Sequence, residues 1–183
     1  MDRSFALELL HEFTETESLR KHAYAVEAAM IAYAKKYRED EDLWGCVGLI
    51  HDFDYEKFPD QHPTKGSEIL KERGVSDEFR KIILGHADYT GVARNTLMAK
   101  TLYAVDELCG FITAVTLVRP TKSISDVKLK SVKKKLKDKN FAAKVNREEI
   151  RKGPEELGED FDEHVMFVVQ SLIPVAESIG LNP

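Results

Sequence analysis

The stretch TESLRKHAYAVEAAMIAYAKKY, residues 16–37, decides the fold class. Its apolar side chains recur at helical spacing, so that one face carries Leu19, Val26, Met30, Tyr33 and Tyr37. Thr16 fits an N-cap, and Glu17 lies near the positive end of the helix dipole. At about 100° per residue, His22 falls on the same apolar face, about 60° from Leu19 and about 40° from Val26. The stretch therefore predicts a long helix that carries a histidine toward the core.

Helical spacing continues through the rest of the chain. Helices are expected around residues 5–14, from the acidic run at 39–42 to His51, from Pro63 to Gly74, from Ser76 through His86, from Asn95 or Thr96 to Pro120, and over 161–179, with two short helices before the last. No alternating run is long enough for a sheet. We predict an all-α fold, a compact bundle of roughly six to nine helices. Residues 1–118 form its core, and a basic C-terminal helical extension, residues 119–183, packs on the same domain.

Length and composition exclude several classes of protein. The chain has 183 residues, 43% hydrophobic and 32% charged, as in an ordinary globular domain that needs no disulfide or structural metal. No stretch is apolar enough to span a membrane and the N-terminus has no secretory pattern, so we expect a cytoplasmic protein without membrane contact. Cys46 and Cys109 lie in apolar helical patterns and are expected to be buried, which argues against zinc-finger and redox-dithiol readings.

The net charge of −5 is unevenly distributed. Residues 119–152 hold thirteen Lys/Arg and four Asp/Glu, which leaves fourteen and twenty-eight elsewhere, so a segment of +9 follows a body of −14. Two interpretations stay open, a solvated basic helix pair lying on the acidic body, or a segment that helps to hold an anionic substrate. The acidic body argues against nucleic acid as a partner.

Histidines and aspartates gather on faces that otherwise bury apolar groups. Asp106 lies among Leu102, Val105 and Cys109, where an ionised carboxylate needs a positive partner such as a divalent cation. His51 and Asp52 are adjacent, so both side chains reach one ion only where a helix ends or bends. Four histidines can join these aspartates, namely His22, His51, His62 and His86. By contrast, we expect His11 and His164, which have polar neighbours, at the surface.

Five motifs occur in order along the chain: LRKHAYAV at 19–26, GLIHDFDYEKF at 48–58, HPTKGSEIL at 62–70, ILGHAD at 83–88 and YAVDELCGF at 103–111. Together they resemble the HD-domain superfamily of metal-dependent phosphohydrolases over residues 16–120. The resemblance implies an HD-like helical domain with His22, His51, Asp52 and Asp106 as metal ligands. It also implies that His62 and His86 are the further ligands of two-metal members, in which Asp52 bridges the ions.

The resemblance implies metal-dependent hydrolysis of a phosphate ester or anhydride in a nucleotide or small phosphorylated metabolite, through a metal-activated water. One or two divalent ions are expected, Mn, Fe, Co, Ni or Zn, with Mg as a further candidate. Asp52 takes part in catalysis at the metal, and Asp54, Glu56 and Asp60 are candidates for an acid or base. Lys21, Arg119 and Lys122 are candidates for phosphate contacts.

Two alternatives remain open at this stage, a di-iron HD-type oxygenase and a non-catalytic nucleotide-binding HD module. A small phosphorylated substrate is the expected partner in the leading interpretation. A homodimer is a candidate assembly.

Overall fold

The computed structural model describes residues 1–182, which form nine α-helices and three short 3-10 turns without any strand. The helices are α1 (Arg3–Phe13), α2 (Glu17–Tyr37), α3 (Glu41–Ile50), α4 (Thr64–Glu72), α5 (Asp77–Leu84), α6 (Leu97–Leu117), α7 (Leu129–Lys137), α8 (Arg147–Leu157) and α9 (Phe161–Leu172). The 3-10 turns are η1 (Asp88–Thr90), η2 (Ile124–Asp126) and η3 (Ile173–Val175). The all-α prediction of six to nine helices is confirmed. No helix in the described range combines the length and apolar character required to cross a membrane.

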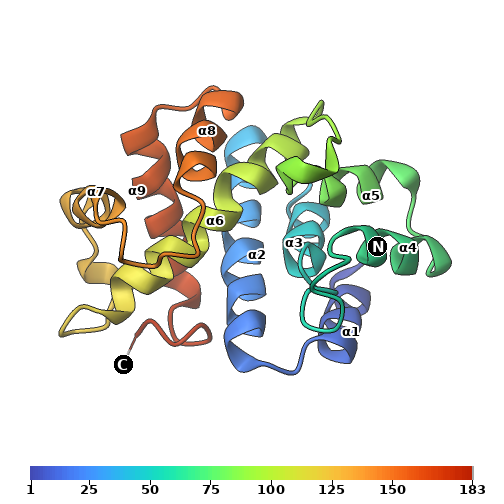
Figure 1. Ribbon diagram of the computed structural model, residues 1–183, viewed down its shortest axis with the longest axis horizontal. Helices are drawn as coiled ribbons and strands as arrows, with labels where there is room; N and C mark the ends of the chain where they lie inside the picture. Colours follow the sequence, from blue (N-terminus) through green and yellow to red (C-terminus); the bar gives the residue numbers. More distant parts are fainter. Residues whose placement is uncertain (183) are drawn as a thin grey trace.

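The two long helices, α2 and α6, form the centre of the bundle (Figure 1). Helix α2 packs on α3 along one side and on α6 along another, and α1 covers α3. Helices α7, α8 and α9 all contact α6, whereas α4 and α5 pack on each other at the opposite end of the molecule. Helices α2, α3 and α6 contact one another and therefore present side chains to a shared interior.

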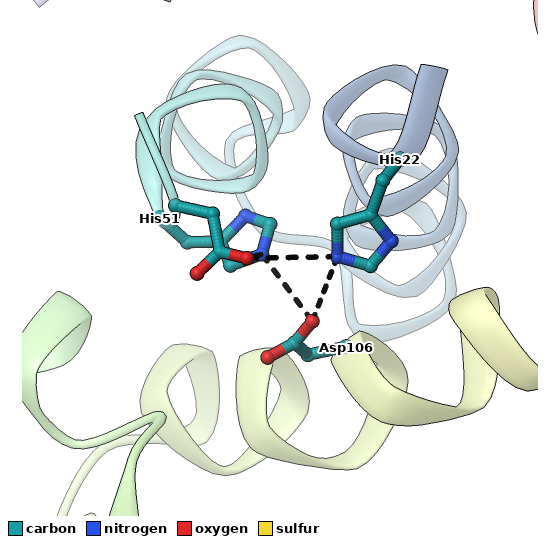
Figure 2. Close-up of side chains that lie close together, drawn as sticks. His22, His51 and Asp106 are labelled. Atoms are coloured by element: carbon teal, nitrogen blue, oxygen red, sulfur yellow. Dashed lines mark hydrogen bonds and ion pairs between the residues drawn. The ribbon is translucent and has the colours of Figure 1, made fainter. Parts of the chain in front are cut away.

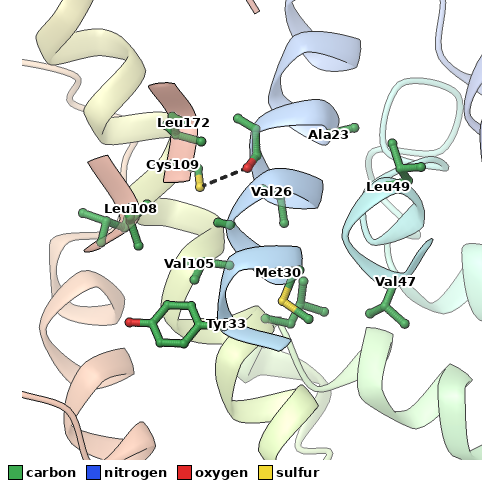
Figure 3. Packing of buried hydrophobic residues seen from close by; sticks show 14 of the residues in the cluster. Ala23, Val26, Met30, Tyr33, Val47, Leu49, Val105, Leu108, Cys109 and Leu172 are labelled. Carbon is green, nitrogen blue, oxygen red and sulfur yellow. Dashed lines mark hydrogen bonds between the residues drawn. The ribbon is translucent and has the colours of Figure 1, made fainter. Parts of the chain in front are cut away.

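One continuous hydrophobic core joins these helices, and Figure 3 shows its middle around Val26 and Met30 of α2. It draws buried side chains from both sides of residue 118, among them Val115 and, in the basic segment, Val132 and Leu136. Cys46 and Cys109 are free and buried, as the apolar spacing predicts. The basic segment is thus anchored to the core of the molecule through its apolar side chains.

Helix α8 approaches α6 unusually closely at Gly153. A Cβ atom built on Gly153 would lie 2.6 Å from the Cα of Ala104, a separation that only glycine permits. The contact holds α8 against the helix that carries Asp106.

Two helix ends differ from the sequence prediction. Helix α9 ends at Leu172 rather than near residue 179, because Pro174 lacks the amide hydrogen that a continuing helix requires, and the turn η3 follows. Helix α5 ends at Leu84 with Gly85 as its C-cap, so His86 lies just beyond the helix and not on its face. The earlier end leaves His86 on a turn that points back toward the bundle centre.

The surface assignment of His164 is wrong, since this side chain is fully buried. Its Nε2 donates to the carbonyl of Ala104 (3.0 Å), and its Nδ1 accepts from the hydroxyl of Tyr33 (2.5 Å). Burial lowers the pKa of His164, which favours the neutral ring that these two bonds require. His11 is exposed, as expected, and bonds Tyr24.

Candidate metal centre

Four side chains from three helices converge at the centre of the bundle. His22 projects from α2, His51 caps the C-terminus of α3, Asp52 follows it, and Asp106 projects from α6. One ligand atom of each lies within 4.8 Å of the others. Figure 2 shows the imidazoles of His22 and His51 directed at the carboxylate of Asp106, at 3.0 and 3.3 Å from Oδ1. Donor atoms that share an ion about 2.0–2.2 Å away lie roughly 3 to 3.5 Å apart, so this spacing suits a common cation.

A second group, formed by Asp52, His62 and His86, adjoins the first. The Nε2 atoms of His62 and His86 lie 3.2 and 3.3 Å from Oδ1 of Asp52. The other oxygen of Asp52, Oδ2, faces the first group and lies 3.5 Å from Nε2 of His51. Asp52 thus presents one carboxylate oxygen to each group, which is the geometry of a bridging ligand.

The hydrogen bonds of the rings fix which nitrogen of each histidine is free. Nδ1 of His51 donates to the carbonyl of Gly48 (2.7 Å), and Nδ1 of His86 donates to that of Ile83 (2.5 Å). A carbonyl only accepts, so in the neutral rings each Nε2 carries a lone pair. Nε2 of His51 is buried without a hydrogen-bond partner within the described residues.

The second group also contains ring nitrogens that carry a lone pair in the neutral rings. Nδ1 of His62 faces the carboxylate of Asp54 at 2.8 Å, so Nε2 of His62 also carries a lone pair. This Nε2 lies 3.2 Å from Nε2 of His86, which in the neutral rings places two lone pairs against each other. A cation at each group satisfies these atoms, so the residues present fit a divalent metal.

The carboxylates dominate the electrostatics of both groups. Burial opposes protonation of His51, but the nearby charges of Asp52 and Asp106 outweigh it and raise its pKa well above the usual value. In His62, burial is likewise outweighed by Asp52 and Asp54, which raise its pKa to about 9. Burial raises the pKa of Asp106, but His51 and His22 outweigh it and lower the pKa below the usual range. The site therefore attracts positive charge, in the form of protons or of metal ions.

Asp54 lies behind the second group. Its buried carboxylate faces His62 Nδ1 at 2.8 Å and accepts from the backbone N–H of Gly66 at 2.7 Å. A Cβ on residue 66 would lie 2.7 Å from the Asp54 carboxylate carbon, so the glycine makes this approach possible. Asp54 consequently orients a candidate ligand rather than facing the open side of the site.

Two other candidates for the acid or base lie outside both groups. Glu56 accepts from the N–H groups of Glu15 (2.9 Å) and Thr16 (3.0 Å) and from the Thr16 hydroxyl, at the start of α2. Thr16 has the N-cap position predicted for it, but Glu56 supplies the capping carboxylate. Asp60 is exposed on the following turn. The structure brings neither carboxylate to the metal ligands.

Of the three predicted phosphate-binding cations, Lys21 lines a neighbouring pocket together with His22, whereas Arg119 and Lys122 lie beyond the end of α6. Lys21 pairs with Glu17 one turn earlier on α2, at 2.6 Å. Arg119 donates to Ser131 Oγ (3.2 Å), and Lys122 is exposed beyond the end of α6. Because an α-helix rises about 1.5 Å per residue, Leu117, the last residue of α6, lies roughly 16 Å along the helix axis from Asp106, and Arg119 follows this end. The end of α6 faces away from the metal ligands.

An open cavity of about 500 Å³ lies over both groups. Five of the six candidate ligands line it, His51 being fully buried behind them. The remaining walls include residues that sequence reasoning did not single out: Tyr55, Tyr89, Glu107, Lys144, Asn146 and Glu149. Burial and the adjacent negative charge of Asp106 raise the pKa of Glu107 to about 7. The sequence contained one indication of this wall, because Lys144 belongs to the basic segment that its charge distinguishes from the rest of the chain.

The fold is an all-helical bundle, and its two adjoining His/Asp groups are able to hold metal. The protein is therefore of the class of helical proteins with a candidate metal centre. The family model described as the HD domain matches residues 19–110, half of the chain, and the chain belongs to this family. Comparisons with curated proteins and with solved structures gave no significant match. Members of the HD superfamily are in general metal-dependent phosphohydrolases.

Proposed function

We propose that the protein is a metal-dependent phosphohydrolase acting on a nucleotide or another small phosphorylated metabolite. The observation that carries the proposal is the convergence of three Nε2 atoms, from His51, His62 and His86, around the carboxylate of Asp52, which would be shared by ions held at both groups. His22 and Asp106 complete one site for a divalent ion. The nitrogen and carboxylate donors suit Mn, Fe, Co, Ni or Zn, with Mg as a further candidate.

In the proposed reaction, water attacks phosphorus as the P–O bond to the leaving group breaks. One proton of the water passes to the leaving oxygen, and the products are inorganic phosphate and either an alcohol, from an ester, or a shorter phosphate, from an anhydride. A divalent ion, when bound, lowers the pKa of a coordinated water and neutralises phosphate charge. The chain's own contribution is to fix the donor atoms: Asp54 orients His62, and the Gly48 and Ile83 carbonyls orient His51 and His86.

Metal analysis of the purified wild type and an Asp52→Ala variant, together with a phosphate-release screen of nucleotides and sugar phosphates, tests the proposal. Because Asp52 faces both groups, its loss is expected to remove both ions and all phosphate release. Asp60→Ala, on an exposed turn nearby, is the control and keeps both. Retained metal with unchanged activity in the Asp52→Ala variant contradicts the proposal.

The same preparation separates the alternatives. Iron in the protein as isolated, a mixed-valent EPR signal and dioxygen consumption without phosphate release would indicate a di-iron oxygenase. Tight nucleotide binding without turnover across the screen would indicate a non-catalytic module.

A further inference from the structure

The cavity that contains the candidate metal ligands also holds a second cluster of polar side chains. Asn146, the N-cap of α8, donates from its backbone N–H to Glu107 (3.2 Å) and from its side chain to Glu149 (2.7 Å). These three residues, the acceptor wall, line the same cavity as the candidate metal ligands. Their unused carboxylate oxygens can accept hydrogen bonds, which favours a ligand with hydroxyl or amino groups.

Lys144 lies beside the acceptor wall. Among the described residues it is the one lysine or arginine that lines the cavity, and it is exposed. Arg147 holds the loop that carries Lys144, because its guanidinium donates to the carbonyls of Asp138 (2.9 Å), Phe141 and Val145 (3.2 Å). The loop is thus a fixed structure that delivers a single cation to the cavity.

The charges of the cavity limit what it can bind. A phosphate monoester carries about −1.5 to −2 at pH 7, and each further phosphate adds negative charge. Beyond the metal ligands, one lysine shares the cavity with Glu107 and Glu149, and the negative charge that these carboxylates carry when ionised repels additional phosphates. A ligand with one phosphate therefore brings less negative charge to these carboxylates than a polyphosphate chain does.

We propose that the cavity selects a monophosphate ester of a hydroxyl-bearing group, with Lys144 contacting the phosphate and the carboxylates of Glu107 and Glu149, which Asn146 holds in place, accepting hydrogen bonds from the rest. The inference rests on the proposed function. Hydrolysis breaks the single P–O ester bond, water supplies the new P–O bond, and the displaced oxygen takes a proton to leave as a hydroxyl. No oxidant or reductant takes part.

Two measurements on the full, Mn-loaded chain test it. Phosphate release is measured for ribose 5-phosphate, a nucleoside monophosphate and its triphosphate, and orthophosphate binding is measured by calorimetry. Lys144→Met is expected to weaken orthophosphate binding and to raise KM about tenfold to a hundredfold, because a charge-assisted bond is lost. Lys139→Met, an exposed lysine of the same segment outside the cavity, is the matched control and behaves as wild type. Lys144→Arg is expected to restore part of the affinity.

A second variant tests the acceptor wall. Glu107→Gln with Glu149→Gln is expected to raise the ratio of triphosphate to monophosphate turnover by about tenfold, because the negative charge that these carboxylates carry is removed. Wild-type preference for the triphosphate overturns the selection of a monophosphate while leaving the phosphohydrolase proposal intact. Equal phosphate binding by Lys144→Met and wild type overturns the role of Lys144. Absence of release from every ester overturns the proposed function, and orthophosphate binding then decides the role of Lys144 independently.

Discussion

Replacing Asp54 with asparagine should weaken one metal site and spare the other. The Asp54 carboxylate is 1% exposed and contacts both His62 Nδ1 and the Gly66 N–H. An asparagine offers one carbonyl oxygen, so its NH2 group must face one of these two donors. The expected loss is one charge-assisted hydrogen bond, about 1.5–3 kcal/mol. That free energy corresponds to about a tenfold to hundredfold loss of affinity, the range typical of residues that orient a ligand.

The assay is competition of Mn²⁺ or Zn²⁺ between the protein and a chromophoric chelator, with the stoichiometry measured on the same sample. The ion held by His62 and His86 should weaken, while the ion held by His22, His51 and Asp106 keeps its affinity. Asp60→Asn removes the same charge from an exposed turn and serves as control. Circular dichroism confirms that the variant is folded. Wild-type affinity at both sites, or an equal loss at both, would refute the reasoning.

Two further predictions concern stability. Glu56→Gln should lower the melting temperature without changing metal content. Because hydrogen bonds from Thr16 lower the pKa of Glu56, the loss of stability relative to wild type should be complete above the ordinary pKa of 4.5 and should vanish as pH falls through the lower pKa of the folded state. Urea midpoints of both proteins at several pH values measure this difference. His164→Phe should reduce the free energy of unfolding by about 2 kcal/mol or more, because Tyr33 and the Ala104 carbonyl lose buried partners. Since burial lowers the pKa of His164, its neutral ring stabilises the fold above pH 6.5 and this contribution declines as pH falls toward the folded-state pKa; a chemical denaturation series shows whether Phe removes that dependence.

The helices could be predicted from local spacing, as could the side of each helix that carries a candidate ligand, whereas the resemblance implied that these ligands meet. His22 shares the apolar face of its helix, and the end of α3 at Ile50 allows His51 and Asp52 to turn toward one place. Amino-acid composition alone could not have predicted where these side chains lie. The two-group arrangement followed from the resemblance, since spacing alone leaves His62 and His86 as separate histidines.

The errors have equally local causes. His164 has acidic neighbours in sequence, yet Val168 and Leu172 lie four and eight residues later on the same helix face, a buried pattern that marked its position. Glu56 was ambiguous because a loop carboxylate reaches a helix N-terminus and an active site with equal ease. Lys144 could not be placed, since its position depends on how a loop far along the chain returns to α6.

The close contact of Gly153 with Ala104 has a consequence for selectivity. Glu149 lies one turn before Gly153 on α8, and Asp106 lies two residues after Ala104 on α6. Because the backbones of α8 and α6 touch at Gly153 and Ala104, the packing of these helices fixes the distance between Glu149 and the candidate ligand Asp106. A bulkier residue at position 153 would push α8 away from α6 and change this distance, and with it the size of ligand that the proposed site accepts.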